Sequence, residues 1–409
     1  MGDRTAGERK IAWAQSHMPV LGSTRARFER EHPLQGRTLS AVLHVEAKTA
    51  VLALALRAAG ADVHLAAGNP LSTDDDVVAS LVAEGIDTRA RKGESTAEYT
   101  AAVQALLQFD PELIIDDGCD LVALAHTARA DRGRILGSTE ETTTGVHRLR
   151  ALEATGKLRF PAINVNDAQM KHLFDNRFGG GQSILDGIFS ATNLLIAGRT
   201  CVVAGYGWSG QGLASRLRGI GGEVIVTEVD PVRALEARLE GFRVLPMKEA
   251  APAADLIVTV TGMREVVAEE HFGLLKDGCL LANAGHFDVE VSREALLRSS
   301  VSHRTVRPQV EEFVLANGRK VYLLSEGRLV NLAAGQGHPV EIMDLSFALQ
   351  ALSTEHLALH AAQLQPKVYR VPPEIDRRVA EAALPAFGIR IDRWTDRQRE
   401  YATSWEMGT

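Results

Sequence analysis

The chain has 409 residues, of which 24% are charged and 45% hydrophobic, and its formal net charge is −7. At about 150 residues per domain, this length predicts two or three domains with ordinary buried cores. The acidic balance argues against a general nucleic-acid-binding protein, which would present a basic face. No apolar run reaches the roughly 20 residues of a membrane helix. The amino-terminal residues do not resemble a signal peptide and the three cysteines have no regular spacing, so we expect a cytoplasmic protein with reduced thiols.

The first half of the chain alternates short apolar runs with helical stretches. The predicted strands cover residues 39–45, 62–67, 112–115 and, more weakly, 134–137. The predicted helices cover residues 49–59 and a stretch that begins at Ser72. Near-continuous apolar strands of this kind indicate a parallel sheet covered by helices on both faces, and ligands bind beyond the carboxyl ends of such strands. Polar residues expected to converge there are His44, Gly68, Asn69, residues 116–120 and residues 139–144.

A second alternating block begins near Thr200. Its predicted strands cover residues 200–204, 223–228, 255–260, 280–282 and 319–324. Helices are predicted at 176–197 and 340–358, and the chain ends in a polar, arginine-rich segment. The predicted fold is therefore α/β, with two doubly wound parallel-sheet lobes, one of them a Rossmann domain. We expect a substrate-binding lobe at 1–175, a nucleotide-binding lobe at 176–332, and a return to the first lobe at 333–409.

A glycine motif follows the first strand of this second block. Gly205, Gly207 and Gly210 have the spacing of the dinucleotide-binding turn and open a helix, so that pyrophosphate would lie at the helix amino terminus. Glu228 ends the next strand, where a carboxylate suits a ribose diol and favours NAD over NADP. Arg233 complicates this distinction, because a guanidinium suits a 2′-phosphate. The sequence thus predicts NAD as the cofactor.

Other groups of polar residues admit a structural interpretation as well as a functional one. His286, after the strand at 280–282, suits either a site or a structural role. Thr142 to Thr144 suit either helix capping or a contact with a carboxamide. Lys171 and Asp175 would lie on one face of a helix, either as a surface ion pair or as a tuned base. The carboxylates of residues 116–120 lack a histidine cluster, so we expect no metal.

Taken together, these motifs resemble the S-adenosylhomocysteine hydrolase family, and the resemblance extends from Trp13 to about Tyr401. The segments that carry it are IIDDGCD (114–120), STEETTTGVH (138–147), PAINVND (161–167), FDN (174–176), AGYG (204–207), TEVDP (227–231), GHFDVE (285–290), EGRLVNL (326–332) and GHP (337–339). The resemblance implies a redox-neutral reaction with bound NAD. The 3′-hydroxyl of a nucleoside is oxidised, the 4′-hydrogen is removed, the 5′-substituent leaves, and the ketone is reduced again.

The resemblance also implies roles for individual residues. It implies that the catalytic groups are His44, Asp117, Glu141, Lys171, Asp175 and His286. Residues implied to bind the substrate are Glu46, Lys48, Thr49, Gly68 and His338. Residues implied or expected to bind the cofactor are Thr142, Thr143, Thr144, Asn176, Gly205, Gly207, Gly210, Glu228, Arg233, Thr261 and Asn331.

Several positions depart from the family pattern. The family threonine that helps to hold the sugar is Glu46 here, and the glutamate that meets the adenine amine is Lys48. Two active-site cysteines are replaced by Gly68 and Gly180. The family's carboxy-terminal Lys…Tyr segment, which reaches a neighbouring subunit, has no counterpart before Thr409. A donor in place of an acceptor costs binding free energy if it stays unpaired, so these changes indicate a rebuilt substrate pocket.

From these departures we predict a nucleoside dehydratase, which would lose water to give a 4′,5′-unsaturated nucleoside in natural-product biosynthesis. The alternatives are ordinary hydrolysis of S-adenosylhomocysteine, a nucleoside 3′-dehydrogenase that releases NADH, and an inactive regulatory paralogue. The expected partners are a nucleoside substrate and further copies of the chain in a dimer or tetramer. We expect neither nucleic acid nor a membrane as a partner.

Overall fold

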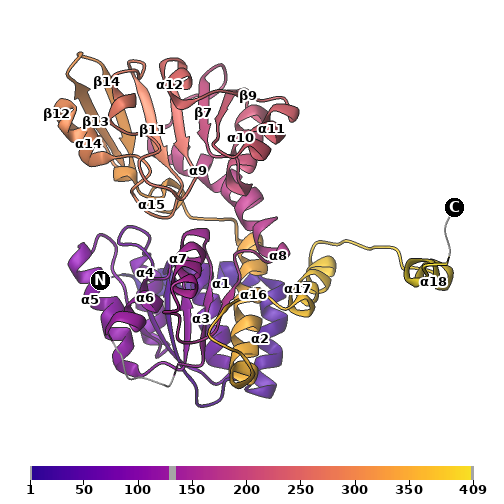
Figure 1. Ribbon diagram of the computed structural model, residues 1–409. Helices are drawn as coiled ribbons and strands as arrows, with labels where there is room; N and C mark the ends of the chain where they lie inside the picture. The colour runs from indigo at the N-terminus through magenta and orange to yellow at the C-terminus, as the bar shows by residue number, and fades with distance from the viewer. Residues whose placement is uncertain (1, 129–134, 407–409) are drawn as a thin grey trace.

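The computed structural model describes residues 2–128 and 135–406, which form two lobes with a central β-sheet in each (Figure 1). The chain enters the upper lobe through α9 (Gly180–Thr192) and, in the lower lobe, continues through α16 (Val340–His360). The last helix, α18 (Asp396–Thr403), lies apart from both lobes at the end of an extended segment. The predicted α/β class with two sheet-based lobes is confirmed.

The lower lobe contains seven parallel strands in the order β15-β6-β5-β4-β1-β2-β3. Their bounds are β1 (Thr38–Leu43), β2 (Asp62–Ala67), β3 (Asp87–Arg89), β4 (Leu113–Asp116), β5 (Gly137–Glu140), β6 (Ala162–Asn164) and β15 (Val368–Arg370). In β1, Ala41 and Leu43 pack in one core cluster and Val42 packs in the other. Both faces are buried, which is why these strands are apolar without alternation.

Helices cover both faces of this sheet. One face packs against α1 (Arg4–Ser16), α2 (Pro19–Glu31), α3 (Ala47–Ala58), α4 (Asp75–Ala83), α16 and α17 (Pro373–Ala386). The other face packs against α5 (Thr96–Leu106), α6 (Asp120–Ala128) and α7 (Thr143–Ala154). Because α16 follows the upper lobe in sequence but packs against α2 and α3, the lower lobe is completed by residues far apart in the chain.

The upper lobe has eight strands in the order β12-β13-β14-β11-β10-β7-β8-β9. They are β7 (Thr200–Ala204), β8 (Glu223–Thr227), β9 (Arg243–Val244), β10 (Leu256–Thr259), β11 (Cys279–Asn283), β12 (Ser300–Arg307), β13 (Val310–Leu315) and β14 (Lys320–Leu324). The β12–β13 and β13–β14 pairs are antiparallel, and the remaining pairs, including β11 with β14, are parallel. The glycine motif lies between β7 and α10 (Trp208–Gly219).

The helices of the upper lobe also cover both faces. One face carries α9, α10, α11 (Pro231–Leu239) and α15 (Val330–Ala333). The other carries α12 (Met247–Ala250), α13 (Glu269–Phe272) and α14 (Arg293–Arg298). A short helix, α8 (Gln169–His172), and a π-helical turn, η2 (Asp175–Gly179), precede α9. No helix within residues 2–128 and 135–406 is long and apolar enough to cross a membrane.

Some elements differ from the prediction. The helix expected from Ser72 is α4, which begins at Asp75 because the Asp74 side chain accepts from the Asp76 backbone N–H and caps it. The weak strand expected at 134–137 is β5, displaced toward its carboxyl end, and residue 134 lies outside the described part. The helix expected at 176–197 ends at Thr192, because Asn193 adopts a left-handed conformation. The sequence reading missed β12, which is a polar and almost fully exposed edge strand.

Candidate active site

A cavity between the lobes collects residues from many elements. It contains about 870 Å³ of space between atoms, a volume that includes its opening to solvent. The predicted site residues that line it are His44, Glu46, Lys48, Thr49, Asp117, Glu141, Thr142, Lys171, Asp175, Asn176, His286, Asn331 and His338. The lower-lobe members lie at or just beyond the carboxyl ends of parallel strands or on α8, η2 and the start of α3, as the fold class predicts.

One group of charged residues surrounds the Lys171 ammonium. Its Nζ lies 3.3 Å from Asp175 Oδ1 and 3.7 Å from Glu141 Oε1. It also donates to the side-chain oxygens of Asn166 (3.3 Å) and Asn176 (3.2 Å). Lys171 is 4% exposed, so this is no surface ion pair. The sequence reading left that interpretation open, and the structure excludes it.

Burial acts on every charge in this group. It would lower the pKa of Lys171, but the carboxylates of Asp175 and Glu141 outweigh it and raise that pKa above its usual value. Burial raises the pKa of Glu141 to about 8, against the opposing charge of Lys171. Burial opposes ionisation of Asp175 too, yet Lys171 and His338 hold its pKa well below the ordinary range. Lys171 is therefore an ammonium in this arrangement, and Glu141 changes charge near neutral pH.

Residues of α16 fix these carboxylates from behind. Ser346 Oγ donates to Asp175 Oδ2 at 2.9 Å, and Gln350 Nε2 donates to Glu141 Oε2 at 2.5 Å. The sequence reading missed both residues. The available signal was the helical spacing of Met343, Ser346 and Gln350, which places the three residues on one face of α16, and Met343 lines the cavity.

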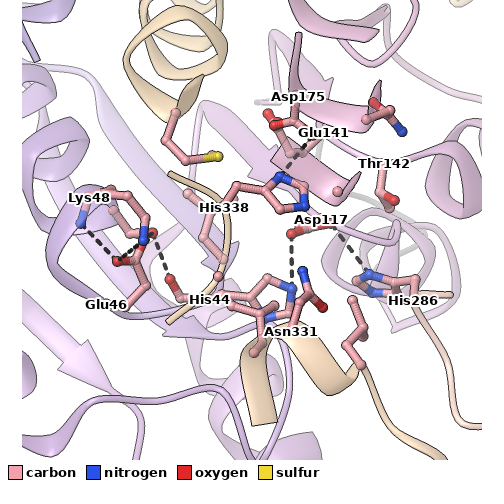
Figure 2. A pocket seen from close by; sticks show the side chains of 18 of the residues that line it. His44, Glu46, Lys48, Asp117, Glu141, Thr142, Asp175, His286, Asn331 and His338 are labelled. Carbon is pink, nitrogen blue, oxygen red and sulfur yellow. Dashed lines mark hydrogen bonds and ion pairs between the residues drawn. The ribbon is translucent and has the colours of Figure 1, made fainter. Parts of the chain in front are cut away.

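A second group contains two histidines around Asp117 (Figure 2). His44 Nε2 lies 3.3 Å from Asp117 Oδ2, and His286 Nδ1 lies 3.6 Å from Asp117 Oδ1. Burial lowers the pKa of His44 to about 4, although the charge of Asp117 opposes this shift. The nitrogen and oxygen atoms with which His44, Asp117 and His286 could bind a metal ion all lie within 4.8 Å of one another, a spacing compatible with such an ion. Since buried proton-transfer groups have the same spacing, the absence of a metal stays a prediction.

The turn after β4 brings these groups together. Gly118 has φ of +108°, and a Cβ at this position would lie only 2.5 Å from His286 Nε2. Glycine is therefore required for the close approach of a histidine from the upper lobe to Asp117 of the lower lobe. Arg148 Nη1 donates to the Gly118 carbonyl and to Asp120 Oδ1, both at 2.5 Å, and so holds the turn.

Glu46 and Lys48, the two charged residues that depart from the family pattern, form a largely buried ion pair on the other side of the cavity (Figure 2). Lys48 Nζ lies 2.9 Å from Glu46 Oε2 and donates to the Gln336 carbonyl at 2.8 Å. Glu46 is also the N-cap of α3, where its side chain accepts from the Lys48 N–H. The ammonium is thus paired and 6% exposed, and no desolvated charge is left alone.

The glycine turn has the shape that a dinucleotide requires. Gly205 has φ of +105°, which other residues rarely adopt. A Cβ at Gly210 would lie 2.0 Å from the Gly205 carbonyl oxygen, whereas one at Gly207 would meet only Arg233 Nη1, at 3.5 Å. Gly207 therefore leaves open space where a pyrophosphate would approach the amino terminus of α10. Glu228 lies at the end of β8, and its carboxylate accepts from the Tyr206, Val229 and Asp230 N–H groups.

Unpartnered polar atoms near the predicted nicotinamide end also fit a bound cofactor. Asn331 Oδ1 and Glu141 Oε1 are buried without a hydrogen-bond partner. Thr142 is the N-cap of α7 but makes no side-chain capping bond, so its hydroxyl stays available in the cavity. The capping interpretation of Thr142 is therefore not supported. When bound, NAD supplies the hydride acceptor for the ribose carbinol, which none of the amino-acid side chains can replace.

The remaining predicted residues lie outside the cavity lining. Thr143 interacts with Asn166, and Thr261 binds Glu290 through its N–H (2.9 Å) and hydroxyl (2.7 Å). Thr144 Oγ1 would lie 3.4 Å from a Cβ at Gly262, close to the same turn. Gly68 is buried against His44 rather than open to the cavity. The glycine turn, Glu228 and Arg233 lie beyond the lined volume on the upper lobe.

Together, the glycine turn and the cavity define a two-lobed α/β protein built to bind a dinucleotide beside a second small molecule. The model of the S-adenosyl-L-homocysteine hydrolase family matches residues 1–136, and the model of that family's NAD-binding domain matches residues 176–337. The chain belongs to the S-adenosyl-L-homocysteine hydrolase family, and its cofactor is NAD.

Individual relatives are similar over almost the whole chain. S-inosyl-L-homocysteine hydrolase from Methanopyrus kandleri is 53% identical, with 98% of this chain and 96% of that protein covered. Adenosylhomocysteinase from Saccharolobus solfataricus is 52% identical, with 98% and 97% covered. S-inosyl-L-homocysteine hydrolase from Methanocaldococcus jannaschii is 51% identical, with the same shares covered. Identity therefore does not decide between the two substrates named in these relatives.

Proposed function

We propose that the protein hydrolyses an S-nucleosyl-L-homocysteine whose base is a 6-oxopurine, through transient oxidation of the ribose 3′-carbon by bound NAD. The observation that carries this proposal is the Lys48 ammonium beside the Gln336 carbonyl. Family resemblance places Lys48 at the purine 6-position. A hypoxanthine ring offers an acceptor, O6, to an ammonium and a donor, N1–H, to a carbonyl or carboxylate. An adenine amine would instead place a donor against the Lys48 donor.

The two charged groups suit separate steps of this reaction. Lys171, Glu141 and Asp175 form the group proposed at the 3′-hydroxyl, with Glu141 Oε1 unpartnered and free to accept from a ribose hydroxyl. His44, Asp117 and His286 form the group proposed at the 4′- and 5′-carbons, where protons are removed and returned. Asn176, Thr49 and His338 are proposed to complete the walls of the cofactor and substrate sites.

Loss of water from a 5′-hydroxy nucleoside, as predicted from the sequence, would use the same groups and differ only in the leaving group. The relatives are named for thioether substrates, and this favours homocysteine as the leaving group. An inactive regulatory role would not require the buried Lys171–Asp175 and His44–Asp117 pairs, both of which are present.

The test compares S-inosyl- and S-adenosyl-L-homocysteine as substrates of the NAD-loaded protein, with homocysteine release as the readout. We expect kcat/KM at least about tenfold higher for the inosyl compound, because an unpaired buried donor costs about 1–3 kcal/mol. Lys48→Met should lose this preference, whereas Lys48→Arg should keep part of it. Preference for the adenosyl compound, or loss of water from inosine without homocysteine release, would contradict the proposal.

We also propose that the protein is a homo-oligomer that uses the segment after α17. Beyond that helix the chain runs away from both lobes, and its apolar side chains are exposed: Ile391 by 68%, Trp394 by 60% and Trp405 by 91%. Large apolar side chains gathered on an extended segment are typical of a surface that another protein covers. The family resemblance makes a second copy of this chain the expected partner.

A further inference from the structure

Behind His44, a turn of the chain places a hydroxyl against the ring nitrogen that faces away from Asp117. Ser72 Oγ lies 2.6 Å from His44 Nδ1 and 3.0 Å from the Asn69 carbonyl oxygen. Ser72 is 7% exposed and Asn69 9% exposed, so both residues are buried. Hydrogen bonds join the Asn69 carbonyl, the Ser72 hydroxyl and the His44 ring, and the chain of polar atoms continues to the Asp117 carboxyl, whose Oδ2 lies 3.3 Å from His44 Nε2.

The position of this turn is fixed at both ends against β1. The Gly68 N–H donates to the Leu43 carbonyl at 2.8 Å, and the Asp74 N–H donates to the Val45 carbonyl at 2.9 Å. The Leu71 N–H also donates to the Asn69 side chain at 2.9 Å. Since His44 lies between Leu43 and Val45, the hydroxyl and the ring are held by the same short length of backbone.

This chain of atoms has two complete proton arrangements that differ by one proton. In the first, Asp117 is ionised, His44 Nε2–H donates to it, and the Ser72 hydroxyl donates to Nδ1. In the second, a protonated Asp117 donates to Nε2, Nδ1–H donates to Ser72 Oγ, and the hydroxyl donates to the Asn69 carbonyl. Only the hydroxyl can reverse its direction by rotation, because it is both a donor and an acceptor.

We propose that Ser72 is a positioning residue whose hydroxyl rotates between Nδ1 of His44 and the Asn69 carbonyl, so that the His44–Asp117 pair gains and loses one proton without leaving a buried donor unpaired. This inference rests on the proposed function, in which a base breaks the C4′–H bond. The proton passes to the pair, the electron pair stays on the substrate to form the alkene, and the proton later returns to the reacting molecule. No external acceptor is consumed.

The surroundings of the ring support this assignment. Asp117, His286 and His338 are the titratable groups whose charges act on His44. Burial lowers the pKa of His44 to about 4, so the ring is a neutral imidazole near neutral pH. With Ser72 Oγ 2.6 Å from Nδ1, that nitrogen has a partner in either tautomer, because the hydroxyl can donate or accept.

The first test needs no substrate. Nitrogen-15 spectra of histidine-labelled protein, with the His44 signals assigned by a His44→Asn variant, report which ring nitrogen carries hydrogen. We expect His44 to exchange tautomers as the pH falls. In Ser72→Ala the midpoint should lie at lower pH, because the protonated arrangement would leave Nδ1–H as a buried unpaired donor. A wild-type ring with one tautomer throughout the folded pH range, or an unchanged midpoint in Ser72→Ala, would overturn the proposal.

The second test separates the two chemical steps. With a nucleoside substrate, Ser72→Ala should reduce bound NAD at a rate within about twofold of wild type. The following step at C4′ should slow by about 10- to 100-fold, as expected when a proton-transfer group loses its support. Equal losses in both steps would indicate a structural role and overturn the proposal.

Two further variants provide the controls. Thr73→Val removes the adjacent buried hydroxyl, which has no hydrogen-bond partner, and should leave the tautomer midpoint and both rates unchanged. Ser72→Thr keeps a hydroxyl and should recover most of the C4′ step. If wild-type protein released no homocysteine from either thioether, the proposed function would fail, while the titration would still decide the role of Ser72.

Discussion

The buried carboxylates of this site differ in how many of their oxygen atoms already have a hydrogen-bond or ion-pair partner. Asp175 is held by Lys171, His338 and Ser346, whereas one oxygen of Glu141 has no partner. A buried acceptor without a partner carries a cost in stability, and enzymes accept that cost where a substrate group will bind. Glu141 is therefore the residue whose protonation should be visible in the kinetics.

We predict that kcat/KM rises with pH up to about pH 8, where Glu141 loses its proton. Burial raises the pKa of this carboxyl to about 8. Only the ionised form accepts strongly from a ribose hydroxyl. The measurement is the pH dependence of homocysteine release, compared between wild type and Glu141→Gln. The variant should lose about 10- to 100-fold in rate, which corresponds to about 1.5–3 kcal/mol for a hydrogen bond to a charge, and should lose this limb of the profile.

Glu112→Gln serves as a matched control. Glu112 directly precedes β4, at the end of the sheet away from the cavity, and pairs with Arg37. The control should keep both the rate and the profile. A Glu141→Gln variant with an unchanged acid limb would show that another group titrates.

At the scale of elements, the helix termini organise the site. The glycine turn leads into the amino terminus of α10, Glu46 is the N-cap of α3, and Thr142 is the N-cap of α7. The amino terminus of α2 lacks a cap from its own N-cap residue, Met18, and is capped from a distant helix instead. Each of these ends leaves backbone N–H groups that require acceptors.

We predict different effects on folding stability for two nearby glycine substitutions in the turn before α10. A Cβ at Gly207 has open space, so Gly207→Ala should fold normally but weaken NAD binding by filling the approach to the pyrophosphate. A Cβ at Gly210 would collide with the Gly205 carbonyl, so Gly210→Ala should lower the melting temperature as well. Titration calorimetry with NAD and thermal unfolding measure the two effects. Equal melting temperatures for the two variants would refute this distinction.

We predict that the cap between α16 and α2 is worth about 1–3 kcal/mol of unfolding free energy. Asp344 of α16 accepts from the Val20 N–H at 2.9 Å and the Leu21 N–H at 2.7 Å. Asp344→Ala would leave both donors buried and unpaired. Urea denaturation should show the loss, with a smaller loss for Asp344→Asn, which keeps one acceptor. Glu341→Ala, an exposed position on the same helix, should have little effect.

At the scale of the whole molecule, the candidate active site is built from residues of both lobes. His286, Asn331 and Leu332 come from the upper lobe, while His44, Asp117 and Lys171 come from the lower one. The segment after α17 extends away from both. It contributes no residue to the four core clusters found among the described residues.

We predict that removal of residues 389–409 leaves the melting temperature of the two lobes nearly unchanged, because the removed side chains bury little surface within the chain. The same truncation should reduce the oligomeric state, measured by light scattering after size-exclusion chromatography. An assembly of unchanged mass would show that another surface joins the subunits. A large loss of thermal stability in a monomeric protein would show that the segment packs on its own lobes.

Much of the fold follows from local pattern. Buried parallel strands at β1, β2, β4 and β7 are readable because both faces of each are covered, which forces continuous apolar runs. An edge strand such as β12 cannot be predicted in this way, because an exposed strand does not need a continuous apolar run. The motifs that resemble the family supplied the candidate site residues, and 13 of those residues line one cavity.

What local pattern cannot supply is the set of contacts between residues far apart in the chain. The amino acids themselves specify a dinucleotide-binding turn, because turn geometry depends on neighbouring residues only. The pairing of Lys48 with the Gln336 carbonyl and the capping of α2 by Asp344 depend on how α16 returns to the lower lobe. Such contacts are set by the packing of whole elements. Only the tertiary structure therefore shows that Lys48 forms an ion pair with Glu46, that Lys171 is buried, and that Ser72 forms a hydrogen bond with His44.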